Sequence, residues 1–263
     1  MKRLLLVLAG CSDALDQRLD VIDQPRVLAV ISEPPEVVPG TPVMMSALIA
    51  DPSGVRMDPI AWSLCTAPKP PTEDNAVATG CVENQVTATD EMPVIPMNAC
   101  QTYGPDVAQT GFRPRDPDGT GGYYQPVRAD ITGLDLAFGF ARITCDLPTA
   151  PGDVAHDYQL SYVANANPVL TATIDGDTIT ASWDPPEQYL YYDPDSETLI
   201  TRRESMRVSW FTTSGSFDVD ATAVDETDLT TSVTQTLRGA TAATIFVVLR
   251  DSRGGIATAT LQR

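Results

Sequence analysis

The fold of this chain is indicated most clearly near its carboxyl end, by the residues Val247-Val248-Leu249-Arg250-Asp251-Ser252-Arg253-Gly254-Gly255. They complete an apolar run that begins at Ala243, and a second apolar segment follows at 256–261. Polar residues and glycines between two apolar segments predict a turn between paired strands. We therefore expect residues 243–261 to close the chain as a β-hairpin.

The residues before this hairpin show the same succession of short strands and turns. Asp175-Gly176-Asp177 separates the segments 169–174 and 178–183, and Asp-Gly supplies the positive φ of a tight hairpin turn. In residues 206–211 the apolar Met206, Val208 and Trp210 alternate with Arg207, Ser209 and Phe211, as in a half-buried strand. The whole chain has 22 prolines and 17 glycines among 263 residues, which favours strands and turns over helices. These patterns predict an all-β fold.

Three strands are predicted in the first quarter of the chain, at 26–32, 43–50 and 60–65. Pro34-Pro35 ends the first of them, and Pro39-Gly40 makes a turn before the second. This opening resembles the first strands of immunoglobulin-like domains in bacterial surface proteins, in which Trp62 would be a core residue.

The Val247–Gly255 segment in turn resembles the end of polycystic-kidney-disease-type and fibronectin type III sandwiches, whose penultimate strand runs into an Asp-x-x-Gly turn. Together the two resemblances imply two immunoglobulin-like β-sandwich domains. We place the first at residues 26–165 and the second at 166–263, because Asn165-Ala166-Asn167-Pro168 is polar and turn-prone.

Residues 66–126 interrupt the first domain with many prolines and glycines. A loop of this length needs cross-links to be ordered, so we expect an insertion stapled by disulfides. Four cysteines allow three pairings. We favour Cys65 with Cys81, which bracket a proline-rich loop, and Cys100 with Cys145, which tie that region to a later strand. Strands are expected again at 127–131, 136–145 and 158–164, with a short helix at 136–143 as the alternative.

The amino terminus has the parts of a secretory signal. Lys2-Arg3 precede a short apolar run, and Leu8-Ala9-Gly10-Cys11 resembles the lipobox of bacterial lipoproteins. The resemblance implies that residues 1–10 are a signal peptide and that Cys11 is acylated, with the polar residues 11–25 as a tether. Ser12, where a retention signal would have Asp, favours the outer membrane. The alternative is a buried amino-terminal strand of a cytoplasmic protein.

Charge limits the classes of partner. The formal net charge is −18, and it becomes −20 when Lys2 and Arg3 leave with the signal peptide. Binding of nucleic acid needs clustered lysines and arginines. We therefore expect a membrane through the lipid anchor, and an envelope protein or a glycan, as partners, and no nucleic acid.

Few residues suggest a site. His156 is the single histidine and lies without a nucleophile elbow, so we expect no catalysis and no enzyme. Tyr189 and Tyr191 face one way on a predicted strand, either as a binding patch for a sugar or protein or as part of an edge strand. We expect no cofactor. Calcium at an acidic cluster is the alternative to solvated turns. The clusters are Asp193, Asp195 and Glu197; Asp116 and Asp118; and Asp218, Asp220, Asp225, Glu226 and Asp228.

The sequence thus predicts a lipid-anchored cell-envelope protein with a structural or adhesive role in protein interaction. The alternative is an accessory lipoprotein that binds a glycan or a protein through residues 66–126, since loops on a rigid scaffold often carry recognition.

Overall fold

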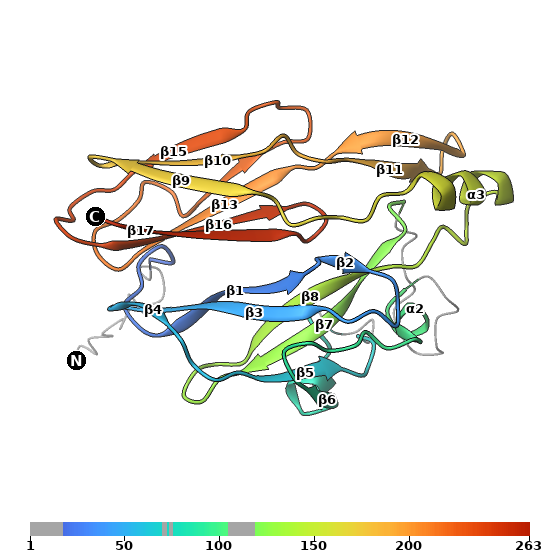
Figure 1. Ribbon diagram of the computed structural model, residues 1–263, viewed down its shortest axis with the longest axis horizontal. Coiled ribbons are helices and arrows are strands. Elements are labelled where there is room, and N and C mark those ends of the chain that lie inside the picture. Colours follow the sequence, from blue (N-terminus) through green and yellow to red (C-terminus); the bar gives the residue numbers. More distant parts are fainter. Residues whose placement is uncertain (1–17, 70–72, 74–75, 105–118) are drawn as a thin grey trace, which may run out of the picture.

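The computed structural model describes residues 18–69, 73, 76–104 and 119–263. The predicted signal peptide, Cys11 and residues 11–17 of the tether lie outside the described residues, as do Asp116 and Asp118. The described chain is mostly β-structure in several sheets, with three short helices (Figure 1).

The N-terminal half, residues 18–165, contains two sheets. The smaller has the order β1-β3-β4 and the larger the order β2-β8-β7-β5-β6. Val43, Ile95 and Val127 are fully buried between these sheets, in a core that also contains Trp62. The elements are β1 Arg26–Glu33, β2 Glu36–Val37, β3 Met44–Asp51, β4 Gly54–Arg56, β5 Ala61–Cys65, α1 Thr79–Val82, β6 Val86–Thr89, α2 Ala99–Thr102, β7 Gly122–Asp130, β8 Ala137–Thr144 and α3 Gly152–Ser161.

The C-terminal half, residues 166–263, has sheets of order β15-β10-β9 and β14-β13-β16-β17 and the two-stranded β11-β12. Trp210, Ile179 and Val247 are fully buried in its core. The strands are β9 Leu170–Asp175, β10 Thr178–Trp183, β11 Gln188–Asp193, β12 Thr198–Arg203, β13 Met206–Thr212, β14 Ala221–Val224, β15 Ser232–Thr236, β16 Thr244–Asp251 and β17 Ile256–Gln262.

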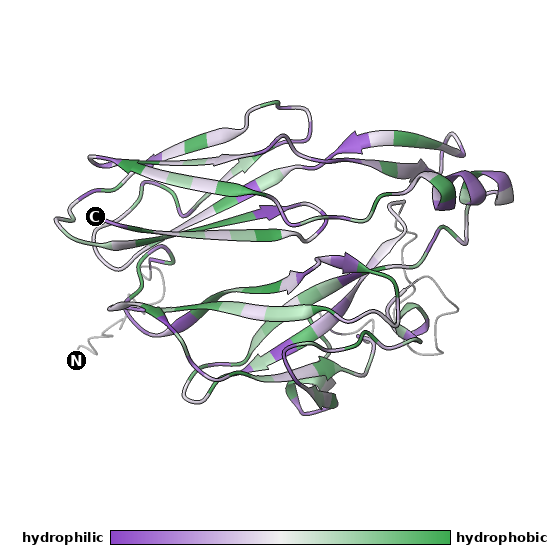
Figure 2. Ribbon diagram, in the orientation of Figure 1, coloured by the Kyte–Doolittle hydropathy of each residue, from purple (hydrophilic) through white to green (hydrophobic). Residues whose placement is uncertain are grey.

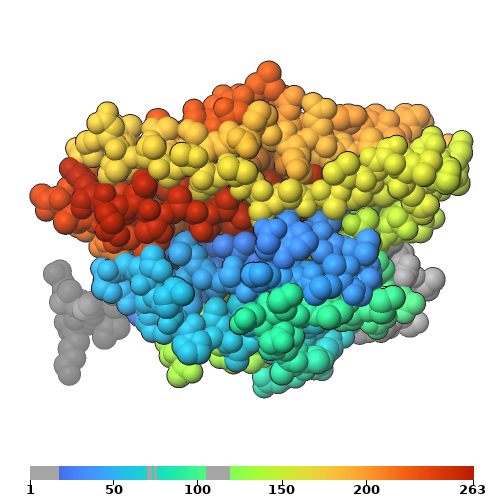
Figure 3. Space-filling view, viewed as in Figure 1, coloured from blue at the N-terminus to red at the C-terminus, as the bar shows by residue number. Residues whose placement is uncertain are grey.

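Strand β16 connects the two halves, because it is buried on both faces. Ile245, Val247 and Leu249 point into the core of the C-terminal half. Phe246 and Val248 point the other way, into a third apolar cluster with residues of β1, β3 and the segment before β1. The space-filling view shows the blue N-terminal strands in direct contact with red and yellow C-terminal residues (Figure 3). A continuous apolar run in β16 is the sequence signature of such double burial.

The strands predicted from the sequence match most of the observed ones. Residues 243–250 and 256–261 pair as β16 and β17. Strands β9 and β10 pair around Gly176, whose φ is +58°. The segment 136–143 forms strand β8 and not the alternative helix. The structure also contains the favoured cystines, Cys65–Cys81 and Cys100–Cys145.

The prediction of a strand at 158–164 is wrong. Residues 152–161 form helix α3, which is largely hydrophilic (Figure 2). Pro151 precedes its first turn, and Tyr158 and Tyr162 stack at 4.6 Å, as side chains four residues apart do on a helix. The spacing of Tyr158 and Tyr162 is that of a helix and not of a strand.

Residues 18–25 were predicted to belong to a polar tether, and they pack instead against the C-terminal half. Ile22 is 1% exposed, and its backbone N–H donates to the Thr212 carbonyl at 2.8 Å. The Asp20 carboxylate accepts the Phe217 N–H at 2.9 Å. The insertion 66–126 also ends earlier than predicted, because β7 begins at Gly122.

Candidate functional site

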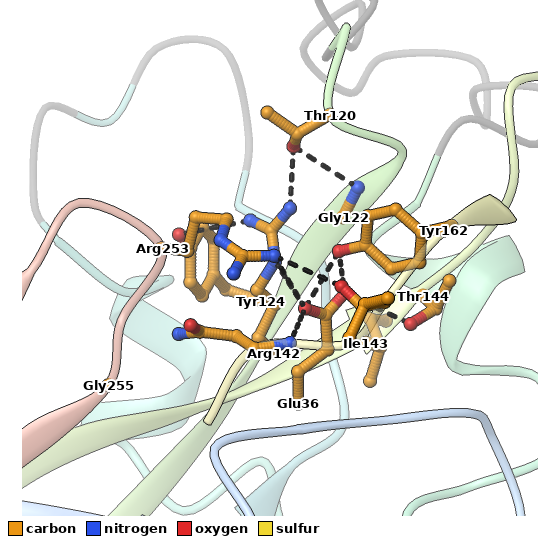
Figure 4. A network of polar contacts seen from close by, with 12 residues as sticks. Glu36, Thr120, Gly122, Tyr124, Arg142, Ile143, Thr144, Tyr162, Arg253 and Gly255 are labelled. Carbon is orange, nitrogen blue, oxygen red and sulfur yellow. Dashed lines mark hydrogen bonds and ion pairs between the residues drawn. The ribbon is translucent and has the colours of Figure 1, made fainter. Parts of the chain in front are cut away.

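Buried charges join the two halves at the end of β16. We call this group the junction cluster; it comprises Glu36, Arg142, Tyr162, Asn165, Glu187, Glu204, Asp251 and Arg253 (Figure 4 shows its centre around Glu36). The side chains of Glu36, Arg142, Arg253 and Glu204 are at most 3% exposed. Charges buried to this extent require partners, and the structure supplies them.

Glu36 is the acceptor at the centre of the cluster. It follows the Pro34-Pro35 segment on β2, and its carboxylate lies 3.2 Å from Nε of Arg142 on β8. The Tyr162 hydroxyl donates to it at 2.7 Å and the Asn165 backbone N–H at 2.8 Å. The hydroxyl of Thr144 donates as well, at 3.0 Å. These donors take the place of water around the buried carboxylate.

Arg253 brings the C-terminal half to this carboxylate. It lies in the β16–β17 turn, where Asp251 accepts the backbone N–H groups of Arg253 and Gly255, each at 2.8 Å. Its Nε donates to Glu204 at 2.8 Å and its Nη2 to Glu187 at 2.7 Å. Its Nη1 lies 3.9 Å from Glu36. One guanidinium therefore links carboxylates from both halves.

Two glycines leave room for these charges. A Cβ at Gly122 would overlap the guanidinium of Arg142, and a Cβ at Gly255 would overlap the carboxylate of Asp251. Any side chain at either position displaces a buried charge.

Acids outnumber bases in the junction cluster. Four carboxylates, those of Glu36, Glu187, Glu204 and Asp251, face the guanidinium groups of Arg142 and Arg253. Burial, together with the negative charge of Asp251, raises the pKa of the Glu204 carboxyl to about 7 against the opposing effect of Arg253. Burial also raises the pKa of Asp251. The cluster can hold a proton near neutral pH.

The predicted binding tyrosines lie beside arginines. Both tyrosines lie on β11. The guanidinium of Arg253 lies 4.9 Å from the ring centre of Tyr189, and the guanidinium of Arg202 lies 4.8 Å from the ring centre of Tyr191. Tyr192 is buried on the opposite face, as the alternation predicts. Burial raises the pKa of the Tyr189 hydroxyl. Tyr189 thus belongs to the edge of the junction cluster.

The acidic clusters form hydrogen-bonded turns. Asp193 accepts the Asp195 N–H at 3.2 Å and the Ser196 hydroxyl at 2.7 Å, and Glu197 follows with a φ of +54°. Asp218 pairs with Arg238, Glu226 pairs with Arg202, and Asp225 and Asp228 bind Thr227 and Thr230. In the part of the chain that the structure describes, no three His, Cys, Asp or Glu side chains gather as a metal site.

His156 is exposed on α3. Among the described residues, no helix is long and apolar enough to cross a membrane.

A groove of about 1030 Å³ runs beside the junction cluster, between β1 and β8. Val27–Val30 and Ala137–Phe140 form its walls, and Tyr124, Arg250 and Ile256 also line it. The sequence predicted neither the groove nor the junction cluster. The closest signal was the Asp251–Gly255 turn, which was assigned to the fold alone.

Comparison with known proteins gives little. The sequence matches no family model, and no curated protein matches it. Among solved structures, the adhesin InvE of Yersinia pseudotuberculosis shares 12% sequence identity at a TM-score of 0.23; the similarity covers 89% of this chain and 58% of that one. The chain thus spans less than two thirds of that structure, and a TM-score this low carries no argument about fold or function.

Proposed function

We propose that this chain is a lipid-anchored cell-envelope protein, built from two immunoglobulin-like β-sandwiches, with a structural or adhesive role in protein interaction and no catalytic one. The observation that carries the proposal is the rigid union of the two halves. An apolar cluster and a buried charge cluster both cross between them. An interface of this kind resists relative motion, as a protein that holds a partner at a distance requires.

The position of the N-terminal end of the described chain supports the same role. The first described residues lie at one end of the long axis, near β4, and helices α2 and α3 lie at the other end (Figure 1). A chain anchored through Cys11 would present the end that carries the Cys100–Cys145 cystine away from the membrane. Acylation at Cys11 would hold it there persistently, since several acyl chains bind far more strongly than one.

The two cystines fit an exported location, because disulfides persist in oxidising compartments. The alternative function, capture of a glycan or a protein by residues 66–126, rests on the same anchor and differs in the surface used.

The test compares wild type with Cys11→Ser in a bacterial host that processes lipoproteins. Intact mass and membrane fractionation are measured first, followed by cell–cell aggregation. We expect the wild type to lose residues 1–10, to gain acyl chains and to aggregate cells, and the variant to do none of these. An uncleaved soluble wild type would contradict the anchor. An anchored protein that does not aggregate cells would contradict the adhesive role and favour the accessory one, which a glycan panel would then test.

A further inference from the structure

The groove between β1 and β8 has an unpaired strand edge as one wall. Strand β8 pairs with β7 along its length, but on its other side, within the described ranges, it pairs only with the short β2, at Arg142 and Ile143. Among these residues no strand pairs with the outer edge of β8 from Ala137 to Phe140, which lies along the groove and contacts β1 through side chains. Unpaired strand edges are templates for another strand.

Hydrogen bonds show which backbone groups point into the groove. The Arg142 N–H donates outward to the Pro35 carbonyl, and the Phe140 carbonyl accepts the Ser32 hydroxyl of β1 at 3.3 Å. Since strand residues alternate, the N–H groups of Phe138 and Phe140 point to the same side. Both N–H groups point away from β7, and no acceptor for either of them lies among the described residues. Pro126 opposite Phe140 is consistent with this, because it has no N–H for the ladder.

An arginine without an acidic partner lies on the same groove. Arg250 is half-buried and donates to the Leu28 carbonyl at 3.0 Å, and among the described residues it makes no ion pair. Its cross-strand neighbour is Arg207, a second cation. In a chain with a net charge of −18, this is a local site for a negative charge.

We propose that the β1–β8 groove binds an extended peptide segment of another protein, which adds as a strand to the β8 edge and places a carboxylate on Arg250. The half-buried apolar side chains that line the groove would receive its alternate side chains: Val27 on β1, Leu136 and Ala137 where β8 begins, and Ile256 on β17. The groove volume of about 1030 Å³ lies just above the range for small-molecule pockets, about 300–1,000 Å³, which suits a peptide segment. Strand addition of this kind takes its affinity from main-chain hydrogen bonds.

This inference deepens the proposed interaction role by naming the surface and the chemistry of the partner. It places recognition outside residues 66–126, the surface of the alternative function. Binding of a peptide by the purified chain does not depend on the lipid anchor, so failure here and failure at Cys11 are separate results.

The experiment uses a phage-displayed library of random short peptides, selected on the purified full chain. The selected peptides are synthesised and their dissociation constants measured for wild type, Phe140→Pro, Phe140→Ala and Arg250→Gln. Phe140→Pro removes the edge N–H, while Phe140→Ala loses the same side chain and keeps that N–H, so the two variants are a matched pair. Melting temperatures establish that each variant is folded.

We expect selected peptides that alternate apolar residues and carry Asp, Glu or a free carboxyl terminus. Phe140→Pro and Arg250→Gln should each weaken binding about tenfold or more, and Phe140→Ala by about threefold at most. In hydrogen exchange, the Phe138 and Phe140 amides should become protected when the peptide binds. Equal binding by Phe140→Pro and Phe140→Ala would overturn the proposal, as would an absence of selected peptides. Decanoate is added in a separate hydrogen-exchange experiment as a lipid-like probe. If decanoate, and not the peptides, protects the Phe138 and Phe140 amides, the proposal is overturned in favour of a lipid-like ligand.

Discussion

At the start of β16 the two halves are joined by apolar side chains, and at its end they are joined by buried charges. The first contact includes Phe246 and Val248 against Leu28 and Ala29. The second includes Arg253 against Glu36 and Glu204. Apolar burial is non-directional and contributes most of the free energy of association. Buried ion pairs contribute less net free energy because desolvation offsets them, but they require defined geometry.

The two contacts should respond differently to pH. The apolar contact has no titratable group, so its contribution is independent of pH. The charged contact contains more acids than bases, so its contribution changes when Glu204 gains or loses a proton.

The largest effect is expected from Phe246→Ala. Phe246 is fully buried, and its truncation leaves a cavity in the apolar contact, so the free energy of unfolding should fall by about 4 kcal/mol. Urea unfolding at pH 5 and pH 8 should give the same loss. Ile200→Ala, on an exposed part of β12, is the control and should change stability by at most about 0.5 kcal/mol. A loss below about 1 kcal/mol for Phe246→Ala would mean that the apolar contact does not join the halves.

Arg253→Met should have the next largest effect. The change removes the cation that faces Glu204, Glu187 and Glu36 and leaves the buried carboxylates of Glu204 and Glu36 without it, at a cost of about 3 kcal/mol. The loss should be greater at pH 8 than at pH 5, because protonation relieves the uncompensated charge. The double variant Arg253→Met/Glu204→Leu should recover part of the lost stability, which a double-mutant cycle measures. Additive losses would contradict a coupled cluster.

The pH dependence of the junction should come largely from Glu204. The folded protein holds a proton on this carboxyl up to about pH 7, whereas the unfolded chain releases it near pH 4.5. Stability contributed by the raised pKa is therefore present below about pH 4.5 and is lost as the pH rises to about 7. Relative to Glu204→Gln, the wild type should lose about 3 kcal/mol over this interval. A constant difference between the two proteins would contradict the raised pKa.

A surface ion pair should behave differently from the junction. Asp218 and Arg238 pair through two hydrogen bonds at 2.7 and 2.8 Å, yet both side chains are more than half exposed. Water and salt screen such a pair, so Asp218→Asn should leave the melting temperature unchanged at physiological salt. A clear decrease would show that charge on this surface matters as much as charge in the junction.

The sequence predicted features that depend on neighbouring residues. The turn at Gly176 and the alternation in β13 follow from local spacing, and the structure confirms both. The pairing of Cys100 with Cys145 followed from the position of each cysteine relative to predicted strands. In each case the information lies within one or two elements.

The junction cluster was not predictable in this way. Glu36, Arg142, Glu204 and Arg253 lie far apart in the chain, and an isolated charge in a sequence is read as exposed. The same limit explains residues 18–25, whose polar composition indicated a tether although Asp20 and Ile22 are buried against the C-terminal half. The β8 edge depends on strand order, which local patterns do not determine.

Through both contacts the two halves should form one cooperative unit. Differential scanning calorimetry of the full chain would test this cooperativity, with wild type compared with the combined Phe246→Ala and Arg253→Met variant. We predict a single transition for the wild type, with equal calorimetric and van't Hoff enthalpies, and two separate transitions for the variant. Two transitions in the wild type itself would show that the halves unfold independently and would contradict this cooperativity.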